Sequence, residues 1–186
     1  MLVTTHIPHP TTAMLKRAFS MLVLAASPLA AQGASPTASA RALWEDVSNY
    51  LVQSAVDMPE AKYSFKPTPA VRSFGELLGH VAGSQSMFCA MALGEKAPAE
   101  DAVEKSTTSK ADLIKALKAS NEYCQRAYAL PDAAVADTVN VFGSVRTKLY
   151  VLMINATHDN EHYGNIVTYL RMNGMVPPSS RPRAGS

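Results

Sequence analysis

Residues 155–174 read NATHDNEHYGNIVTYLRMNG, and the interpretation of the whole chain depends on this stretch. Its apolar residues recur at three- and four-residue spacing, which predicts an amphipathic helix. The closing Asn-Gly pair, followed by two prolines, is a helix-stop signal. His158 and His162 lie four residues apart, so a helix would project both imidazoles from one face.

The same helical face carries further polar residues. Asn155, Asn165 and Tyr169 lie within about 60° of His158 around the helix axis, beside a broad apolar face. A buried polar group needs a hydrogen-bonding partner or another ligand. We therefore expect these three residues either to line a pocket or to make ordinary hydrogen bonds between helices.

Four segments carry helix boundary signals and helical periodicity. Ser73 and Glu76 match a capping box, and Ser109 and Asp112 form a similar pair. No segment shows convincing strand periodicity. We therefore predict an all-α fold, a four-helix bundle within residues 39–178. Two long connections indicate at least one crossover, and the helices are expected at 39–58, 73–94, 109–131 and 144–173.

The N-terminus is typical of a processed export signal. Lys16 and Arg17 precede an apolar run of about 14 residues, shorter than the roughly 20 needed to span a bilayer. Residues 1–34 are therefore predicted to be an N-terminal extension and signal peptide, which implies a periplasmic or secreted protein without a stable membrane anchor. Residues 179–186 are predicted to form a disordered tail.

The charge balance argues against nucleic-acid binding. The chain has 17 basic and 15 acidic residues, a formal net charge of +2. Removal of Lys16 and Arg17 with the signal peptide would leave a neutral chain without a long basic run. Nucleic-acid binding requires a basic surface, so we expect no nucleic-acid partner.

The two cysteines, Cys89 and Cys124, both fall within predicted helices. Export permits a disulfide between them. A small buried thiol inside a helix is the simpler interpretation, which we favour. Cys89 would lie about 180° from His80 on its helix, which argues against a Cys-His nucleophilic pair, whereas Cys124 stays open in that role.

His80 is the third histidine left after signal removal. It lies in FGELLGHVAGSQSMF on the second predicted helix, where its neighbours along one face are mostly apolar. A single histidine there is commonly a hydrogen-bonded core residue. Together with His158 and His162, however, it would supply three imidazole nitrogens and leave a coordination position open, as in catalytic metal sites.

VRSFGELLGHVAGSQ and, far downstream, HDNEHYGNIVTYLRMNGMVPP resemble the DinB/YfiT-like superfamily. The resemblance implies a four-helix bundle, often a homodimer, in which His80, His158 and His162 hold one divalent metal, Zn²⁺ or Ni²⁺. It also implies a metal-dependent transferase or isomerase that uses a low-molecular-weight thiol. Such thiols are not expected in quantity outside the cytoplasm, so a hydrolase acting on an unknown small molecule is the second enzymatic interpretation.

Two other interpretations of the sequence are possible. The letters HDNEH fit an HxxEH metalloprotease motif, but no acidic residue follows His162, so the downstream acidic ligand is missing. We expect Asp159 to be solvated, and Glu161 to be a surface charge or an acceptor for a ligating histidine. The alternative to an enzyme is a non-enzymatic periplasmic metal-binding or structural bundle.

Overall fold

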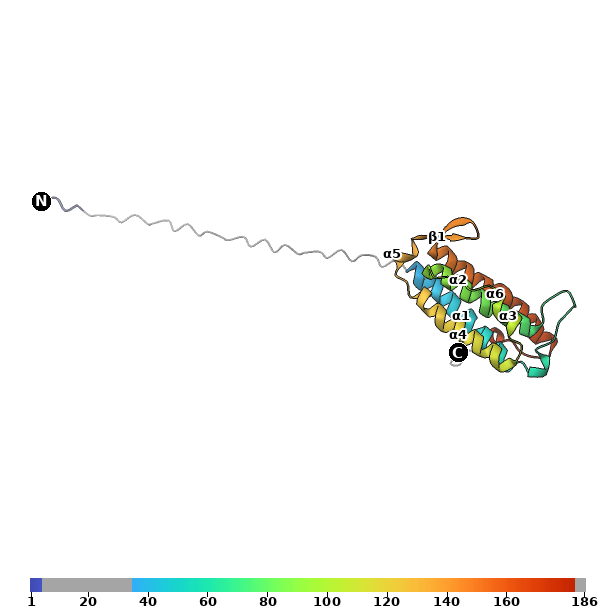
Figure 1. Cartoon of the computed structure of the whole chain (residues 1–186). Helices are drawn as coiled ribbons and strands as arrows, with labels where there is room; N and C mark the ends of the chain where they lie inside the picture. The colour runs from blue at the N-terminus through green and yellow to red at the C-terminus, as the bar shows by residue number, and fades with distance from the viewer. Residues whose placement is uncertain (5–34, 183–186) are drawn as a thin grey trace. The chain divides into compact units, whose positions relative to one another are not determined.

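The computed structural model describes residues 1–4 and 35–182, and long helices run side by side through the second range (Figure 1). The predicted all-α four-helix bundle is confirmed. The signal-peptide prediction concerns residues that, apart from 1–4, lie outside the described part of the chain. The long helices are α1 (Pro36–Asp57), α2 (Phe74–Leu93), α4 (Lys110–Tyr128) and α6 (Lys148–Met172). The short elements are η1 (Glu60–Lys62), α3 (Ala102–Ser106), α5 (Asp132–Val135), β1 (Thr138–Val141), β2 (Ser144–Thr147) and η2 (Pro178–Ser180).

The boundaries of α2 follow directly from local sequence. The Ser73 hydroxyl accepts a hydrogen bond from the backbone N–H of Glu76, and the Glu76 carboxylate accepts one from the N–H of Ser73. This reciprocal capping box satisfies two amide groups that a helix start leaves free. At the other end, Gly94 adopts a left-handed conformation with φ of +72°, which ends the helix.

The four long helices form a ring in which α1 and α2 occupy opposite corners. Each of these two packs against both α4 and α6. Two connections therefore join helices at opposite corners of the ring, one from α1 to α2 and one from α4 to α6. This arrangement accounts for the two long connections and places α2 beside the C-terminal helix.

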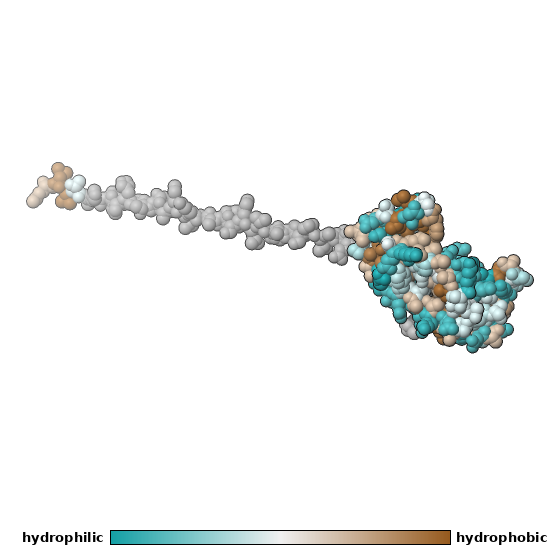
Figure 2. Space-filling view, viewed as in Figure 1, coloured by the Kyte–Doolittle hydropathy of each residue, from teal (hydrophilic) through white to brown (hydrophobic). Residues whose placement is uncertain are grey.

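A β-hairpin replaces the expected start of the last helix. β1 and β2 pair antiparallel. The prediction that the chain has no strands was therefore wrong, as was the prediction that the last helix begins at residue 144. Phe142 and Gly143 both have positive φ, the requirement of a tight two-residue hairpin turn, and α6 begins only after Thr147 caps it. Figure 2 shows apolar side chains gathered around this hairpin, where Phe142 is 69% exposed.

The interior is layered along the bundle axis. One apolar cluster includes Leu51, Leu78 and Ile166, and a second includes Trp44, Phe88 and Leu152. On each long helix, buried polar residues lie at or close to the change from the positions of one cluster to those of the other. This central polar layer consists of Ser48, His80, Ser84, Gln85, Ser120, Asp159 and His162.

Gln85 joins three helices within the polar layer. Its side-chain oxygen accepts a hydrogen bond from Trp44 Nε1 at 2.6 Å. Its Nε2 donates to Ser120 Oγ at 2.8 Å and to Asn121 Oδ1 at 2.7 Å. Since every hydrogen and the oxygen of this buried amide have partners, the network fixes the register of α1, α2 and α4 without a desolvation penalty.

A disulfide joins Cys89 of α2 to Cys124 of α4, so the prediction of two free buried thiols was wrong. The Cα atoms lie 5.3 Å apart, within the usual range for a disulfide. Each cysteine faces the neighbouring helix of the ring, a relation that helical periodicity within one segment does not contain. The pairing also removes Cys124 as a free nucleophile.

Part of the expected disordered tail is packed against the bundle. Pro178–Ser180 forms η2, and the Tyr163 hydroxyl donates a hydrogen bond to Ser179 Oγ at 2.8 Å. Arg181 forms an ion pair with Asp57. Residues 183–186 lie outside the described range. Among the helices described, none has the length and apolar character needed to cross a membrane.

Two glycines let α3 and the residue before its N-cap lie directly on α2. A Cβ atom built on Gly83 would overlap the backbone carbonyl of Glu100, and one on Gly79 would lie 2.8 Å from the Cα of Glu104. Contacts this close leave no room for a side chain. The glycines therefore determine where the acidic segment 100–104 sits.

Gly83→Ala should destabilise the protein by on the order of 1–3 kcal/mol, although alanine ordinarily favours a helix by about 0.5–1 kcal/mol. Gly164→Ala in α6 is the matched control, because nothing lies within 4 Å of its Cβ position. The control should be neutral or stabilising. Urea unfolding of both variants measures the difference, and equal stabilities would contradict the close packing of Glu100 on α2.

Candidate metal centre

Three histidines from two helices meet in the polar layer. His80 comes from α2, and His158 and His162 come from successive turns of α6. One ring nitrogen of each lies within 4.8 Å of the others. The Nε2 atoms of His158 and His162 are 3.1 Å apart, and the ring centroids of His80 and His162 are 4.7 Å apart.

The surroundings keep these imidazoles neutral. His80 and His162 are 6% and 8% exposed, and burial is the main cause that lowers the pKa of all three histidines. His162 has a pKa of about 3, since the other two rings and Arg72 add to the effect of burial. A neutral imidazole has a free lone pair, which is the form that binds a metal.

Hydrogen bonding around His158 orients its ring. The Ser84 hydroxyl donates to the backbone carbonyl of His80 at 2.8 Å. Its oxygen can therefore accept from Nδ1–H of His158, which lies 3.4 Å away. That tautomer leaves the Nε2 lone pair of His158 directed toward His162.

The donor set fits a divalent metal ion. Three neutral nitrogens at this separation match the ligand number and type of open zinc and nickel sites. Nδ1 of His80 and Nδ1 of His162 are buried without a hydrogen-bond partner, so the cluster is not explained as a satisfied hydrogen-bond network. The three residues selected from sequence thus form a site that could hold one ion.

Two carboxylates and a guanidinium beside the cluster were missed from sequence. Glu100 Oε1 lies 3.8 Å from His80 Nε2, and Glu104 Oε2 lies 3.6 Å from His80 Nδ1. Arg72 pairs with Glu104 at 2.9 Å. Arg72 lies in the loop before α2, Glu100 lies before the short helix α3, and Glu104 lies within α3. Helical periodicity gives no direction for side chains in such segments, although the repeated glycine spacing of α2 indicates a close approach.

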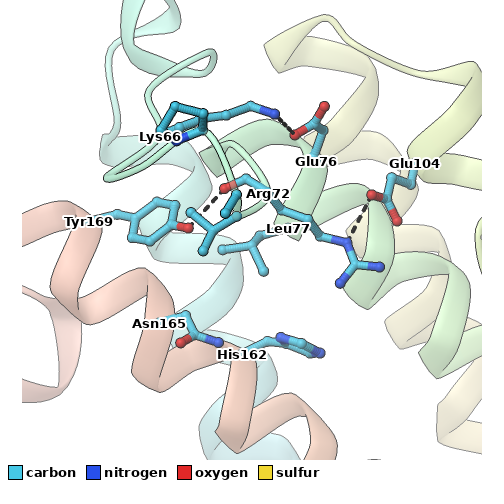
Figure 3. Close-up of a pocket in the computed structure, with 11 residues that line it drawn as sticks. Lys66, Arg72, Glu76, Leu77, Glu104, His162, Asn165 and Tyr169 are labelled. Atoms are coloured by element: carbon cyan, nitrogen blue, oxygen red, sulfur yellow. Dashed lines mark hydrogen bonds and ion pairs between the residues drawn. The ribbon is translucent and has the colours of Figure 1, made fainter.

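A cavity of about 630 Å³ opens beside His162. Figure 3 shows His162 and Asn165 on one side of it and the Arg72–Glu104 pair on the other. The Tyr169 hydroxyl donates to the Arg72 carbonyl at 2.8 Å, which ties α6 to the loop before α2. The other lining residues are Lys66, Pro69, Ala70, Val71, Glu76 and Leu77.

Of the three polar residues expected either to line a pocket or to bond between helices, two line the cavity and one does not. Asn165 and Tyr169 line the cavity beside His162. Asn155 does not line it, because its fully buried side chain donates to the Tyr128 hydroxyl at 3.1 Å. Asn155 therefore serves the second role considered for it, an inter-helix hydrogen bond.

The two acidic residues between the histidines behave differently. Glu161 is exposed, in accord with a surface charge. Asp159 is fully buried, so its expected solvation was wrong. Burial raises the pKa of Asp159 well above its usual value, and both carboxyl oxygens lack a hydrogen-bond partner. Its position falls on the inner side of α6, toward the polar layer.

A protein-family model for the DinB superfamily matches residues 43–166. Comparison with curated protein sequences gives no match. The matched residues include all three histidines, the whole of α2 and α4, and parts of α1 and α6.

Several solved structures share the fold. A DinB-like protein from Bacillus cereus has a TM-score of 0.65 at 17% identity, covering 76% of this chain and 95% of its own. One from Bacillus subtilis has a TM-score of 0.62 at 20% identity, with 78% and 99% covered. A mycothiol-dependent maleylpyruvate isomerase has a TM-score of 0.59 at 16% identity, with 71% and 60% covered. At these identities the similarity concerns the fold.

The low pKa of His162 predicts acid sensitivity of the metal-free protein. The folded value of about 3 lies below the ordinary 6.5, so the unfolded chain binds a proton that the folded chain does not. Stability from this residue is present above pH 6.5 and is lost as the pH falls toward 3. When the pH falls from 7 to 4.5, the free energy of unfolding should decrease by about 2 kcal/mol less in His162→Gln than in the unchanged protein. Urea unfolding at both pH values tests this, and parallel losses would contradict it.

Proposed function

This chain belongs to the DinB superfamily, and we propose that it is an exported metalloprotein in which His80, His158 and His162 hold one divalent ion. The observation that carries the proposal is the convergence of three neutral imidazoles from α2 and α6, two of them buried and that of His158 partly buried. Zn²⁺ and Ni²⁺ both suit nitrogen ligands, so we propose one of these two ions.

His80, His158 and His162 would hold the ion, and a divalent ion bound there would supply Lewis acidity, which would lower the pKa of a coordinated water or thiol. The protein's own residues supply the rest of the site. Ser84 orients the His158 ring, and apolar clusters lie on both sides of the polar layer. Arg72 holds the Glu104 carboxylate beside His80.

We propose that the substrate is a small molecule that enters the cavity beside His162. Its volume of about 630 Å³ falls in the usual range of small-molecule sites. Lys66 and Arg72 lie in its wall, but each is paired with a carboxylate, Glu76 and Glu104 respectively. The wall is thus charge-balanced, which favours a polar substrate that is neutral or carries both signs of charge.

Two reaction classes suit this arrangement. The similarity to a mycothiol-dependent maleylpyruvate isomerase supports a thiol-dependent transfer. Export would separate the protein from cytoplasmic thiols, which supports hydrolysis instead. A non-enzymatic metal-binding bundle is the third proposal, and the open cavity beside His162 favours an enzyme over it.

The disulfide supports export. Cys89–Cys124 links two helices across a sequence separation of 35 residues, and such bonds persist mainly in oxidising compartments. We propose a periplasmic or secreted location, which this bond and the basic and apolar N-terminal sequence support.

Single changes of His80, His158 and His162 to Ala should each lower the affinity for Zn²⁺ at least about tenfold, because each removes a ligand. Elemental analysis and chelator competition measure bound metal per chain. Asn160→Ala is the control, since Asn160 is exposed on the same helix. Stoichiometric metal retained in one histidine variant would remove that residue from the site.

The full chain produced in a Gram-negative bacterium should appear in the periplasm with a new N-terminus near residues 31–35. Thiol titration should find no free thiol before reduction and two afterwards. A chain without residues 1–34 is the control and should stay in the cytoplasm. An uncleaved full chain in the cytoplasmic fraction would contradict export.

A further inference from the structure

The segment that carries Glu100 is fixed to α2 through its backbone. Gly83 has no side chain, and the carbonyl of Glu100 occupies the space where a Cβ would lie. The backbone of Glu100 therefore lies directly on α2 and cannot move closer to it. The Glu100 side chain remains 44% exposed and is able to rotate.

From this fixed point the Glu100 carboxylate reaches two of the histidines. Oε1 lies 3.8 Å from Nε2 of His80 and 4.0 Å from Nε2 of His158. Both distances are too long for hydrogen bonds, so no direct bond explains the approach. Ligand atoms about 2.1 Å from a tetrahedral zinc ion lie about 3.4 Å from one another. A movement of about half an ångström would bring Oε1 to that spacing.

Charge supplies a second, independent reason. Three neutral imidazoles leave both charges of a divalent ion uncompensated in a layer where His80 and His162 are more than nine-tenths buried. Burying an uncompensated charge is costly. Glu104 faces the far nitrogen of His80 and is already paired with Arg72, and Glu161 is exposed. Glu100 is the carboxylate nearest to two ring nitrogens at once.

We propose that Glu100 is a fourth, exchangeable ligand of the metal ion, held in reach by the packing of its backbone on Gly83. This rests on the proposed three-histidine site. Exchange is possible because the carboxylate is half exposed, whereas the histidines are largely buried. Glu100 does not line the cavity beside His162, so a substrate entering there approaches the ion from another direction.

The test compares three variants with the unchanged protein. Glu100→Gln removes the charge but keeps the length of the side chain. Glu100→Asp keeps the charge but shortens the side chain by one methylene group, which the fixed backbone cannot make up. Asp101→Asn is the charge control, because it removes one negative charge from the adjacent position, where the side chain is about as exposed as that of Glu100 and pairs with Lys105. Chelator competition gives the Zn²⁺ dissociation constant, and the visible spectrum of the Co²⁺-loaded protein reports the ligand set.

Both Glu100→Gln and Glu100→Asp should raise the dissociation constant roughly 10- to 100-fold and shift the Co²⁺ bands, while Asp101→Asn should leave both unchanged. If Glu100→Asp keeps the Zn²⁺ affinity and the Co²⁺ spectrum of the unchanged protein, Glu100 is not a ligand. Its effect on the ion would then be purely electrostatic. Equal losses in Asp101→Asn would do the same. If the unchanged protein binds no metal, the three-histidine proposal fails, and this one fails with it. Metal binding that is normal in both Glu100 variants overturns this proposal alone.

Discussion

The protein depends on a polar layer enclosed between two apolar clusters of one helical bundle. A bundle core made only of apolar residues would be simpler to build, because every buried polar atom needs a partner. Here the partners of Gln85 are complete, and those of His80 and His162 are not. The first group fixes how the helices align, and the second leaves ring nitrogens able to bind a ligand.

The same layer relates the fold to the chemistry. Because α2 packs against both α4 and α6, one of its sides contacts α4 and the other contacts α6, and the two sides have different roles. One side is fixed to α4 by Gln85 and by the Cys89–Cys124 disulfide. The other side presents His80 to the two histidines of α6. Rigid attachment on one side keeps His80 in place on the other, which is the usual requirement for a preorganised metal site.

Features within a single helix were predictable from sequence, and features between segments were not. Helical spacing and capping signals located α2 within a residue at each end and selected all three histidines. The disulfide, the burial of Asp159 and the approach of Glu100 depend on which helix faces which, and one periodic pattern does not contain that information. The hairpin was missed because its turn relies on a positive φ at Phe142, a residue type that seldom adopts it.

The position of α6 as the last of the four long helices described has a consequence for assembly. A chain that stops before Lys148 would contain α1, α2, α4 and both cysteines, yet only one of the three histidines. The ion would then bind only after the last helix has docked, and ligands that bind only the native state shift the equilibrium toward it. At the proposed three-histidine site, metal uptake would thus link α2 to α6, the last of the four long helices to be made.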